Sequence, residues 1–494
     1  MEQVRKGKTR AVQDNVHGLI RLTQEEMDVI DHPIFQRLRR IHALGLLYYV
    51  WPSATHTRFE HSLGVCHMSQ KMLSALMDRS KADASKLYTF KDAADGQAVR
   101  FHEMDEETRR RITRLTRITA LVHDLGHGPL SHSFDTFAPK TEDIEPLLDD
   151  ERLDAIRPLG VHLTHGKHGR INHEAASCIL FAKIWHDLGG ELWIPQAIAI
   201  ILLGDHDGTD AIPADIRPWL PFVRDIVSSA PVDADRMDYL LRDSQALGVS
   251  YGLYDSDRVL KSILCVRQDG HYRLGWRLSG LRAIESFILS RFYMFAQCYV
   301  HKTYHVTKLM LSAIQEEASS LDPRLIRTDS LDSFAADYAN LGDELFLATL
   351  ESMASGGTER LVRLTRNLRN RRLWTRLYDF ESDETHLTDR LVAKMREFYP
   401  NERFVRNRHP LSPVKDLEHG SSLARLNRDG KYALTKGRSW IEASSIMRTL
   451  SNEDPAHVRL YMETDESGRN LAKRAREYAI AQMCELRETY PKPE

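Results

Sequence analysis

The stretch Leu121-Val-His-Asp-Leu-Gly-His-Gly-Pro-Leu-Ser-His132 decides how the first half of this 494-residue chain is interpreted. An apolar helical pattern ends here on two adjacent polar residues, His123 and Asp124, at a point where the pattern still predicts burial. Adjacent side chains on a helix diverge by about 100°, which is close to the angle between neighbouring ligands of an octahedral ion. One ion at the helix end could therefore bind both side chains. Gly126 and Gly128, which follow, let a backbone or a ligand approach closely. For a His-Asp pair on its own, a buried hydrogen-bonded pair is the more frequent outcome.

Two distant stretches supply further donors of the same kind. In Arg58-Phe-Glu-His61, His61 falls on a helix face beside Phe59 and Leu63, where an unsatisfied imidazole is costly. Downstream, Asp235 is one of several carboxylates in an otherwise helical, partly apolar stretch. Two His and two Asp form a mixed nitrogen and oxygen donor set, which suits a divalent transition metal (Fe, Mn, Ni, Co or Zn) better than Ca. Such a set leaves open positions for water and a phosphate oxygen.

The composition is that of an ordinary globular protein with more than one unit, because single cores stop growing near ~250–300 residues. Apolar residues make up 42% and charged residues 28%, which excludes disordered, collagen-like and disulfide-scaffold proteins. A net charge of −2 provides no global basic field for nucleic acid. The five scattered cysteines, the absence of an apolar leader and the short apolar runs predict a cytoplasmic protein without a membrane partner. Of the 23 histidines, 14 fall in residues 1–174.

Periodicity predicts a mainly α protein. The expected architecture is a helical core over residues 1–310 and a smaller α+β region over residues 311–494, which contains short β-hairpins and serves regulation or oligomerisation. A capping box at Thr23-x-x-Glu26 predicts a helix start. Strands are expected only from Cys265 onward. The expected elements are helices near 57–77, 106–124, 279–316 and 468–488, hairpins over Cys265–Trp276 and Arg425–Leu434, and a strand over His457–Met462.

Several motifs follow one another without large gaps. They are Val16-His-Gly18, Asp31-x-Pro-x-Phe-Gln-Arg-Leu-Arg39, Tyr48-Tyr-Val-Trp-Pro52, Arg58–Val65, His123–Asp135, His173-Glu174, Asp235–Asp243 and Tyr299-Val-His-Lys302. Together they resemble the SAM-and-HD-domain deoxynucleoside triphosphate triphosphohydrolases, in particular the bacterial type that lacks the SAM domain. The resemblance is strong over residues 5–310 and loose over residues 310–490. It implies a helical HD-domain phosphohydrolase core that hydrolyses a dNTP to a deoxynucleoside and inorganic tripolyphosphate.

Carried over position by position, the resemblance implies four groups of site residues. The metal ligands are His61, His123, Asp124 and Asp235. The catalytic cluster is His127, Asp135 and His173, with His132 as a second candidate for protonating the departing 5′-oxygen. The substrate-binding residues are Arg58, Leu44, Arg236, Tyr239, Asp243, Arg291 and Tyr299. An effector site for GTP or a dNTP, formed between the subunits of a homo-oligomer (a dimer or a tetramer), comprises Asp31, Gln36, Arg39 and Arg372. Mg²⁺ could accompany the nucleotide.

This chain departs from the family pattern near the expected sugar site. Ala43 occupies a position where the mammalian-type enzyme has a Gln that binds the sugar 3′-OH. Arg236 stands where family members often have Lys, and Phe295 and Gln297 replace more polar or basic residues. The sequence therefore leaves the preferred substrate open.

Two other functions remain open from the residues. One is another HD-type phosphohydrolase, such as a nucleotidase or a phosphodiesterase. The other is an ssDNA- or RNA-binding nuclease, because arginines recur at every third position from Arg360 to Arg369 and could contact phosphates. A solvated basic helix face is the simpler interpretation of those arginines.

Overall fold

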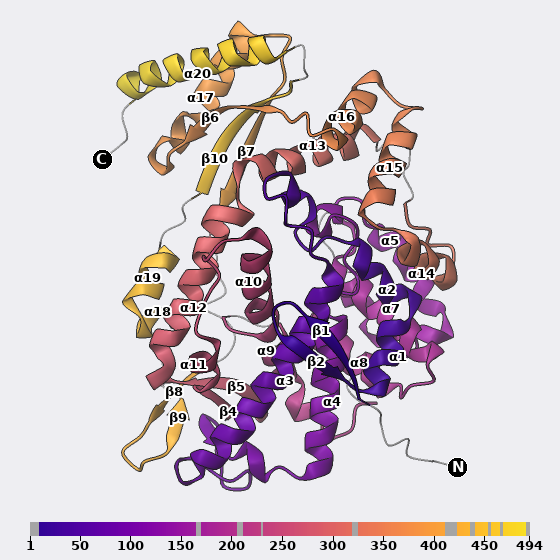
Figure 1. The fold of residues 1–494 in the computed structure, drawn as a ribbon, viewed down its shortest axis with the longest axis vertical. Helices are drawn as coiled ribbons and strands as arrows, with labels where there is room; N and C mark the ends of the chain where they lie inside the picture. Colours follow the sequence, from indigo (N-terminus) through magenta and orange to yellow (C-terminus); the bar gives the residue numbers. More distant parts are fainter. Residues whose placement is uncertain are drawn as a thin grey trace.

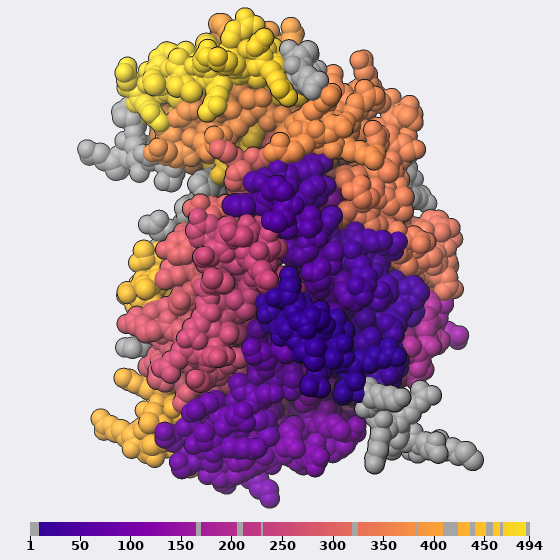
Figure 2. All heavy atoms as spheres, in the orientation of Figure 1, coloured from indigo at the N-terminus to yellow at the C-terminus, as the bar shows by residue number. Residues whose placement is uncertain are grey.

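The computed structural model describes residues 9–164, 169–204, 211–228, 231–318, 325–410, 422–434, 440–452, 456–464 and 468–490. Figure 1 shows a large, mainly helical body that carries a small unit of sheet and helices at one end. The space-filling view shows the indigo N-terminal segment packed at the centre of one face, beside the pink α12 segment (Figure 2). No helix in the described ranges is long and apolar enough to span a membrane.

The helices and strands follow the chain in this order. The longer helices are α1 (Gln24–Asp31), α3 (Arg58–Ala82), α4 (Glu106–Val122), α7 (His173–Asp187), α8 (Trp193–Leu203), α9 (Leu220–Val227), α10 (Ala234–Leu247), α12 (Leu281–Met294), α13 (Lys302–Ala318), α14 (Leu331–Asn340), α15 (Asp343–Ala354), α16 (Glu359–Arg369), α17 (Thr388–Phe398), α19 (Ser445–Asn452) and α20 (Arg469–Thr489). The short helices are α2 (Pro33–Gln36), α5 (Thr141–Ile144), α6 (Gly160–Leu163), α11 (Ser256–Leu260) and α18 (Trp440–Ala443). The strands are β1 (Arg10–Asp14), β2 (Gly18–Leu22), β3 (Gln97–Val99), β4 (Ile263–Gln268), β5 (His271–Arg277), β6 (Thr375–Phe380), β7 (Phe404–Pro410), β8 (Ser422–Leu426), β9 (Tyr432–Leu434) and β10 (Ala456–Met462).

Helices α3, α4 and α10 form the centre of the large body, because α4 and α10 each pack against α3. Helix α4 begins where the Asp105 side chain accepts the backbone N–H of Thr108, an N-cap that satisfies a free amide of the first turn. The helix ends at Val122, which places His123 and Asp124 at its buried C-terminal end. Its buried face has the apolar spacing of an amphipathic helix, with fully buried Ile112, Leu115 and Ile118.

Most of the predicted elements are confirmed. The capping box is present, since the side chains of Thr23 and Glu26 each accept the other residue's backbone N–H. The two predicted hairpins are β4–β5 and β8–β9, and the predicted strand is β10. The helices expected near 57–77, 106–124 and 468–488 are α3, α4 and α20, while a π-helical turn at Phe295–Tyr299 separates α12 from α13.

The prediction that strands begin only at Cys265 was wrong. Strands β1 and β2 form an antiparallel hairpin at the start of the described chain, and β3 also precedes residue 265. In β2, Ile20 and Leu22 are buried and Leu19 is exposed. This alternation has the period of a half-buried strand, but it extends over only five residues and is hard to see beside the long helical patterns.

The C-terminal part contributes to three separate cores, the third being a small one inside the barrel. Strand β10 lies between β6 and β7 in an antiparallel sheet, and α17 and α20 pack on that sheet around their own apolar core. In contrast, α14 to α16 add residues such as Phe334 and Leu364 to the large core. Strands β8 and β9 close a barrel with β3, β4 and β5. The domain boundary at residue 310 therefore stays a prediction, because segments from both sides of it share the large core.

A histidine–aspartate pair joins the first part of the chain to α15. Nδ1 of His42 lies 2.7 Å from Oδ2 of Asp343, and the backbone N–H of His42 donates to the same oxygen at 2.9 Å. This hydrogen bond raises the pKa of His42 above its ordinary value, although burial lowers it. A protonated His42 thus makes a charge-assisted contact with a residue 301 positions away.

We expect His42→Asn, which keeps a neutral N–H donor near the Nδ1 position, to destabilise the fold in a pH-dependent way. Because the pKa of His42 is raised in the folded protein, its charge stabilises the fold fully below pH ~6.5 and stops doing so as pH rises through the raised pKa. The expected loss is about 1–2 kcal/mol of unfolding free energy at low pH, shrinking in alkaline buffer. Urea unfolding at low pH and in alkaline buffer measures the loss of unfolding free energy. An equal loss under both conditions would contradict the charged pairing of His42 with Asp343.

Candidate active site

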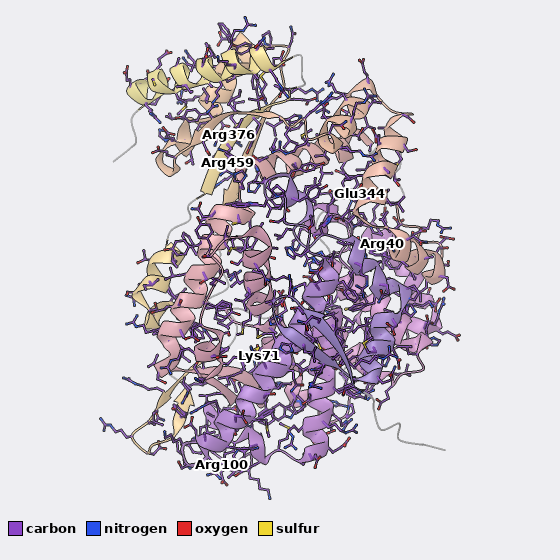
Figure 3. The ribbon with its side chains drawn as sticks, viewed as in Figure 1. Arg40, Lys71, Arg100, Glu344, Arg376 and Arg459 are labelled. Carbon is purple, nitrogen blue, oxygen red and sulfur yellow. The ribbon has the colours of Figure 1, made fainter. Side chains whose placement is uncertain are left out.

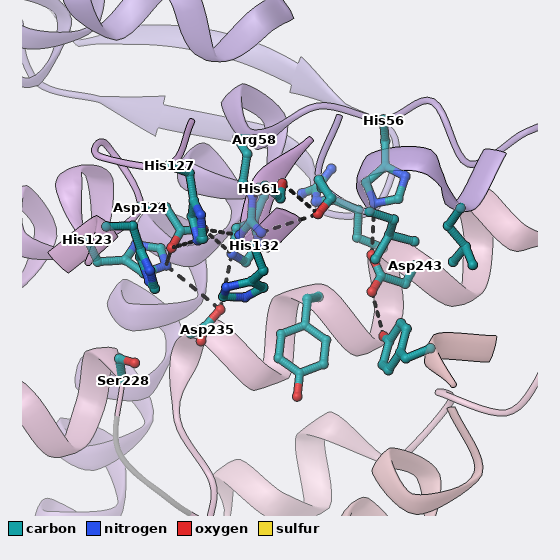
Figure 4. A pocket seen from close by; sticks show the side chains of 18 of the residues that line it. His56, Arg58, His61, His123, Asp124, His127, His132, Ser228, Asp235 and Asp243 are labelled. Atoms are coloured by element: carbon teal, nitrogen blue, oxygen red, sulfur yellow. Dashed lines mark hydrogen bonds and ion pairs between the residues drawn. The ribbon is translucent and has the colours of Figure 1, made fainter. Parts of the chain in front are cut away.

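A cavity of about 620 Å³ lies at the C-terminal end of α4. Figure 4 shows His123, Asp124 and Asp235 on one side of it and His56 and Asp243 on the other. Elements far apart in sequence supply its walls, which include Leu44, His56, Arg58, His61, His123, Asp124, His127, His132, His173, Asp235, Tyr239, Asp243, Tyr299, Tyr304 and Lys308.

The four predicted metal ligands converge at one side of this cavity. Nε2 of His61 lies 3.1 Å from Oδ1 of Asp235 and 3.4 Å from Oδ2 of Asp124. Nε2 of His123 lies 3.5 Å from Oδ1 of Asp124 and 3.8 Å from Oδ1 of Asp235. Ligand atoms bound to one ion at about 2.1 Å lie roughly 3 Å apart. These side chains therefore need only small shifts to share an ion.

The two imidazoles are held with Nε2 toward the cluster. Nδ1 of His61 lies 2.8 Å from Oδ2 of Asp238, and Nδ1 of His123 lies 2.8 Å from the carbonyl oxygen of Ala120. When each Nδ1–H donates to its acceptor, each Nε2 keeps the lone pair that a metal-ligating histidine requires. Nε2 of His123 is buried and has no hydrogen-bond partner among the described residues. This unpaired donor atom and the mixed donor set both fit a divalent transition metal.

The surroundings of the cluster favour positive charge at its centre. Burial raises the pKa of Asp235, but the nearby imidazoles of His123 and His61 outweigh burial, so the pKa falls below its ordinary value. Burial also acts on Asp124, whose pKa is nevertheless held well below the ordinary value by the charge of Arg58 and the nearby imidazoles. Burial lowers the pKa of His61 and His123, yet the carboxylates around them raise both overall. Both aspartates are therefore ionised at neutral pH and attract a cation.

Three further imidazoles lie beside the cluster. The rings of His127 and His173 stack with centroids 3.8 Å apart, and His132 meets them edge-on at 4.7 and 5.3 Å. Nε2 of His127 lies 3.4 Å from Oδ1 of Asp124. Burial, followed by the charge of Arg58, holds the pKa of His127 well below its ordinary value, and burial also lowers the pKa of His173. These two rings are therefore neutral at pH 7 and can accept a proton, while His132 is exposed.

Asp135, which was predicted to join this group, lies at its margin. Half of its side chain is exposed, and its carboxylate contacts Nδ1 of His132 at 3.8 Å. It is not among the residues that line the cavity. The structure therefore brings three of the four predicted catalytic residues together and leaves Asp135 outside the cavity.

Arg58 links the metal cluster to the loop that follows α4. Its NH1 group donates to Asp124, its Nε donates to the hydroxyl of Ser131 at 3.1 Å, and its NH2 group donates to the carbonyl of Ala43 at 3.2 Å. The side chain is buried at the edge of the cavity. This fixed guanidinium is well placed to face an anion bound beside the cluster.

A different group of side chains forms the opposite end of the cavity. Nε2 of His56 lies 2.8 Å from Oδ1 of Asp243, and the hydroxyl of Tyr299 donates to Oδ2 at 2.5 Å. Burial, followed by the charge of Asp243, raises the pKa of Tyr299 well above its ordinary value, so the phenol stays protonated. Leu44 and Tyr239 also line this end. The cavity thus combines an ionic end with an end suited to hydroxyl groups and a ring.

The chain is similar to several known proteins. The HD associated region family model matches residues 255–402. An uncharacterised protein of Methanocaldococcus jannaschii is 29% identical over 73% of this chain and 58% of its own length. The deoxynucleoside triphosphate triphosphohydrolase SAMHD1 homolog of Dictyostelium discoideum is 27% identical over 74% of this chain and 59% of its own length. The matched region and these relatives are typical of an HD-domain, dNTPase-like family, to which this chain is similar. It spans less than two thirds of the length of both of these relatives.

The fold also has relatives among solved structures. A phosphohydrolase from Bacteroides thetaiotaomicron superposes with a TM-score of 0.60 and 21% identity, over 92% of this chain and 100% of that chain. The mainly helical architecture predicted from the sequence is thereby confirmed.

Two predicted substrate residues lie outside the cavity. Arg236 pairs with the buried carboxylate of Asp233 in the first turn of α10. The guanidinium of Arg291 lies over the ring of Phe295, 5.5 Å from its centroid. Neither arginine is among the residues that line the cavity, so their contact with substrate stays a prediction.

The predicted effector residues are divided between two places. Asp31 ends α1, Gln36 donates to the carbonyl of Ile30 at 2.8 Å, and Arg39 donates to Gln36 at 2.8 Å. Arg372 instead lines a second cavity, and the other three are not among the described residues that line it. Within a single chain they form no common pocket, so the site between subunits stays a prediction.

Sequence reasoning missed three residues that support the site. Asp238 is fully buried and connects Nδ1 of His61 to Nε2 of His17, which lies 2.6 Å from its Oδ1. The third is His56, which holds Asp243. One available signal was the spacing of Asp238 three residues after Asp235, which places both on one helix face. The pairing partners themselves are set by tertiary contacts and leave no local pattern.

We expect Asp238→Asn to weaken metal binding, because the amide cannot accept hydrogen bonds from both imidazoles. Loss of the hydrogen-bond partner of a metal-ligating histidine typically lowers metal affinity about 10- to 100-fold. Calorimetric titration of the metal-stripped protein with Mn²⁺ or Fe²⁺ measures the change. Asp83→Asn is the control, since Asp83 is buried and paired with Arg277 at 3.0 Å, outside the cavity. Equal affinities in the Asp238→Asn variant and the control would refute the role of Asp238.

Proposed function

We propose that this chain hydrolyses deoxynucleoside triphosphates to deoxynucleosides and inorganic tripolyphosphate. The observation that carries the proposal is one cavity with metal-donor groups at one end and a His56–Asp243–Tyr299 hydrogen-bonded group at the other. Its volume of about 620 Å³ falls in the ~300–1,000 Å³ range of small-molecule sites. The activity in the name of the Dictyostelium relative adds support.

The ionic end suits the triphosphate. His61, His123, Asp124 and Asp235 would hold the divalent transition ion, and Mg²⁺ could accompany the nucleotide. A bound ion of this kind polarises a phosphoryl oxygen and lowers the pKa of a bound water. Arg58 balances phosphate charge at the edge of the cluster.

The imidazole group handles the protons of the reaction. His127 is buried and His173 half-buried, and both are neutral at pH 7, so either can accept the proton that the attacking water releases. His132 lies edge-on to both rings and is exposed, so it can exchange protons with solvent and supply one to the departing 5′-oxygen. Breaking the bond between the α-phosphorus and the 5′-oxygen then gives the deoxynucleoside and tripolyphosphate.

The other end suits a deoxyribose. Leu44 and Tyr299 would crowd a 2′-hydroxyl, and the hydrogen bond to Asp243 keeps the phenol of Tyr299 in place. Ala43 offers no polar side chain to a 3′-hydroxyl. Asp243 keeps acceptor capacity on both oxygens, so it is the group that would bind that hydroxyl.

The decisive experiment incubates the purified protein with each dNTP and Mn²⁺ or Mg²⁺, with and without GTP, and separates the products. We expect deoxynucleoside and tripolyphosphate, and Asp124→Ala should reduce turnover by at least about 1,000-fold because it removes a ligand and the partner of Arg58. Cys484→Ser changes an exposed side chain and is the control for nonspecific effects of substitution. It should leave turnover unchanged.

The alternatives give other products in the same assay. Monophosphate and pyrophosphate, or hydrolysis of a nucleoside monophosphate or a phosphodiester in place of dNTPs, would identify another HD-type phosphohydrolase. Shortening of ssDNA or RNA, inhibited by salt, would identify a nuclease. No turnover of any dNTP under all effector conditions would end the triphosphohydrolase proposal.

A second cavity supports the regulatory part of the proposal, in which GTP or a dNTP binds as effector and promotes a homo-oligomer. It has a volume of about 440 Å³, and none of the described residues that line it is acidic. Its basic residues are Lys302, Arg371, Arg372, Arg376, Arg469 and Arg476. Such a cavity suits a polyphosphate. Helix α13 separates the two cavities, because Lys302 and Val306 line this one while Tyr304 and Lys308 line the first.

We expect Arg372→Glu to raise the GTP concentration needed for half-maximal activation by at least about 10-fold, because it replaces a phosphate-facing cation with a like charge. Activity without GTP should remain. Arg366→Glu is the matched control, since Arg366 is exposed on α16 and does not line the cavity. If Arg366→Glu instead weakens salt-sensitive ssDNA binding while GTP has no effect, the arginine-rich segment serves nucleic acid.

A further inference from the structure

We propose that Asp343, the first residue of α15, is a positioning residue that fixes the backbone of the loop Gly128–His132 and thereby aligns Arg58 at the cavity. The inference rests on the proposed function for its activity readout. It concerns a residue of the HD associated region, which the family model places at residues 255–402.

The loop has a backbone conformation that requires outside support. Leu130 and Ser131 are consecutive non-glycine residues with φ of 58° and 54°. Residues with a Cβ rarely adopt this left-handed region. The carbonyl of Leu130 also lies so close to Gly45 that a Cβ at Gly45 would come within 2.7 Å of its oxygen. Such a conformation persists only where the surrounding contacts over-determine it.

The carboxylate of Asp343 makes these contacts with both of its oxygens. Oδ1 accepts the backbone N–H of Leu130 at 2.7 Å. Oδ2 accepts the backbone N–H of His42 at 2.9 Å and lies 2.7 Å from Nδ1 of the same residue. Asp343 is only 2% exposed, so solvent cannot replace these bonds. One buried side chain therefore fixes the loop and the segment that lies beside it.

The contacts continue from Asp343 to a side chain that lines the cavity. The hydroxyl of Ser131 lies 2.9 Å from the carbonyl of His42, to which it can donate, and it accepts a hydrogen bond from Nε of Arg58 at 3.1 Å. Asp343 holds His42 and Leu130, the two residues on either side of this hydroxyl. Asp343 thus determines where the Ser131 hydroxyl meets Arg58. The residue after Ser131 in the loop is His132, which belongs to the imidazole group.

The α14–α15 corner, where α14 ends and α15 begins, also supports His127, the residue before the loop. Arg37 is fully buried and donates to the carbonyl of His127 at 2.8 Å, and its guanidinium lies 5.0 Å from the ring centroid of Tyr338 in α14. Figure 3 labels Arg40 and Glu344 where the α14–α15 corner meets the first part of the chain. The corner therefore acts on the loop at two points, directly through Asp343 and through Arg37.

The test uses Asp343→Asn in the full-length protein, because this change keeps the side-chain volume but removes one acceptor oxygen and the charge. We expect kcat for dNTP hydrolysis to fall about 10- to 100-fold, the scale of a small misplacement of catalytic groups, with KM and bound metal unchanged. In the same variant without substrate, hydrogen exchange in peptides that cover residues 126–134 should be faster than in the wild-type protein.

Asp225→Asn is the matched control. Asp225 is also buried, and its carboxylate accepts the backbone N–H of Leu274 at 3.0 Å and two hydrogen bonds from Arg273. This control removes the same kind of contact in another part of the core. It should lower thermal stability without changing kcat or the exchange of the loop.

A double-mutant cycle tests the path through Ser131. Adding Ser131→Ala to Asp343→Asn should lower kcat no further than the stronger single substitution, because both remove the same alignment. Additive losses, or loop exchange in Asp343→Asn equal to that of the wild-type protein, would overturn the proposal. If Asp343→Asn does not fold, Ser131→Ala alone should lower kcat with bound metal unchanged, and an unchanged kcat there would overturn it as well. Lack of dNTP turnover by the wild-type protein would end the proposed function, while the exchange experiment still decides the role of Asp343.

Discussion

Carboxylates that are buried in an apolar core must be paired, and this requirement governs the structure around the cavity. Asp124 is buried and Asp235 half-buried at the ends of helices whose other faces are packed with aliphatic side chains, where an unpaired buried charge costs several kcal/mol. The imidazoles of His61 and His123 and the guanidinium of Arg58 balance them. A metal ion would complete the same balance at the point where the donor atoms converge. The donor geometry thus serves stability and chemistry together.

The same requirement connects distant parts of the chain. Three buried aspartates each pair with a histidine from the first 56 residues, across separations of 187, 221 and 301 positions. The pairs are His56 with Asp243, His17 with Asp238, and His42 with Asp343. The excess of histidine in the first 174 residues therefore has two physical origins. Some imidazoles face the cavity, and others hold the aspartates that support it.

The sequence could predict the donors of the site better than their supports. His123 and Asp124 are recognisable because two adjacent polar residues interrupt an apolar helix, and His61 because an imidazole on an apolar face requires a partner. The signal for Asp238 is weaker, since a carboxylate three residues after Asp235 is also typical of a solvated helix face. Its burial depends on His17, which only the folded chain brings near. The hairpin β1–β2 was missed for a related reason: two five-residue strands are too short to establish a period by themselves.

The boundary at residue 310 stays a prediction, and segments on both sides of it share one core. Helices α14 to α16 bury their apolar faces in the same core as α3 and α4, and Asp343 on α15 bonds to the loop that ends at His132. Helix α13 forms a wall of both cavities. The sheet of β6, β7 and β10 with α17 and α20 has an apolar core of its own, and so does the barrel of β3, β4, β5, β8 and β9. Because one core transmits displacements between all elements packed in it, a ligand that moves α13 also acts on the wall of the first cavity. The walls of both cavities are therefore built largely on one packed body, while the sheet of β6, β7 and β10 keeps most of its apolar side chains in a separate core.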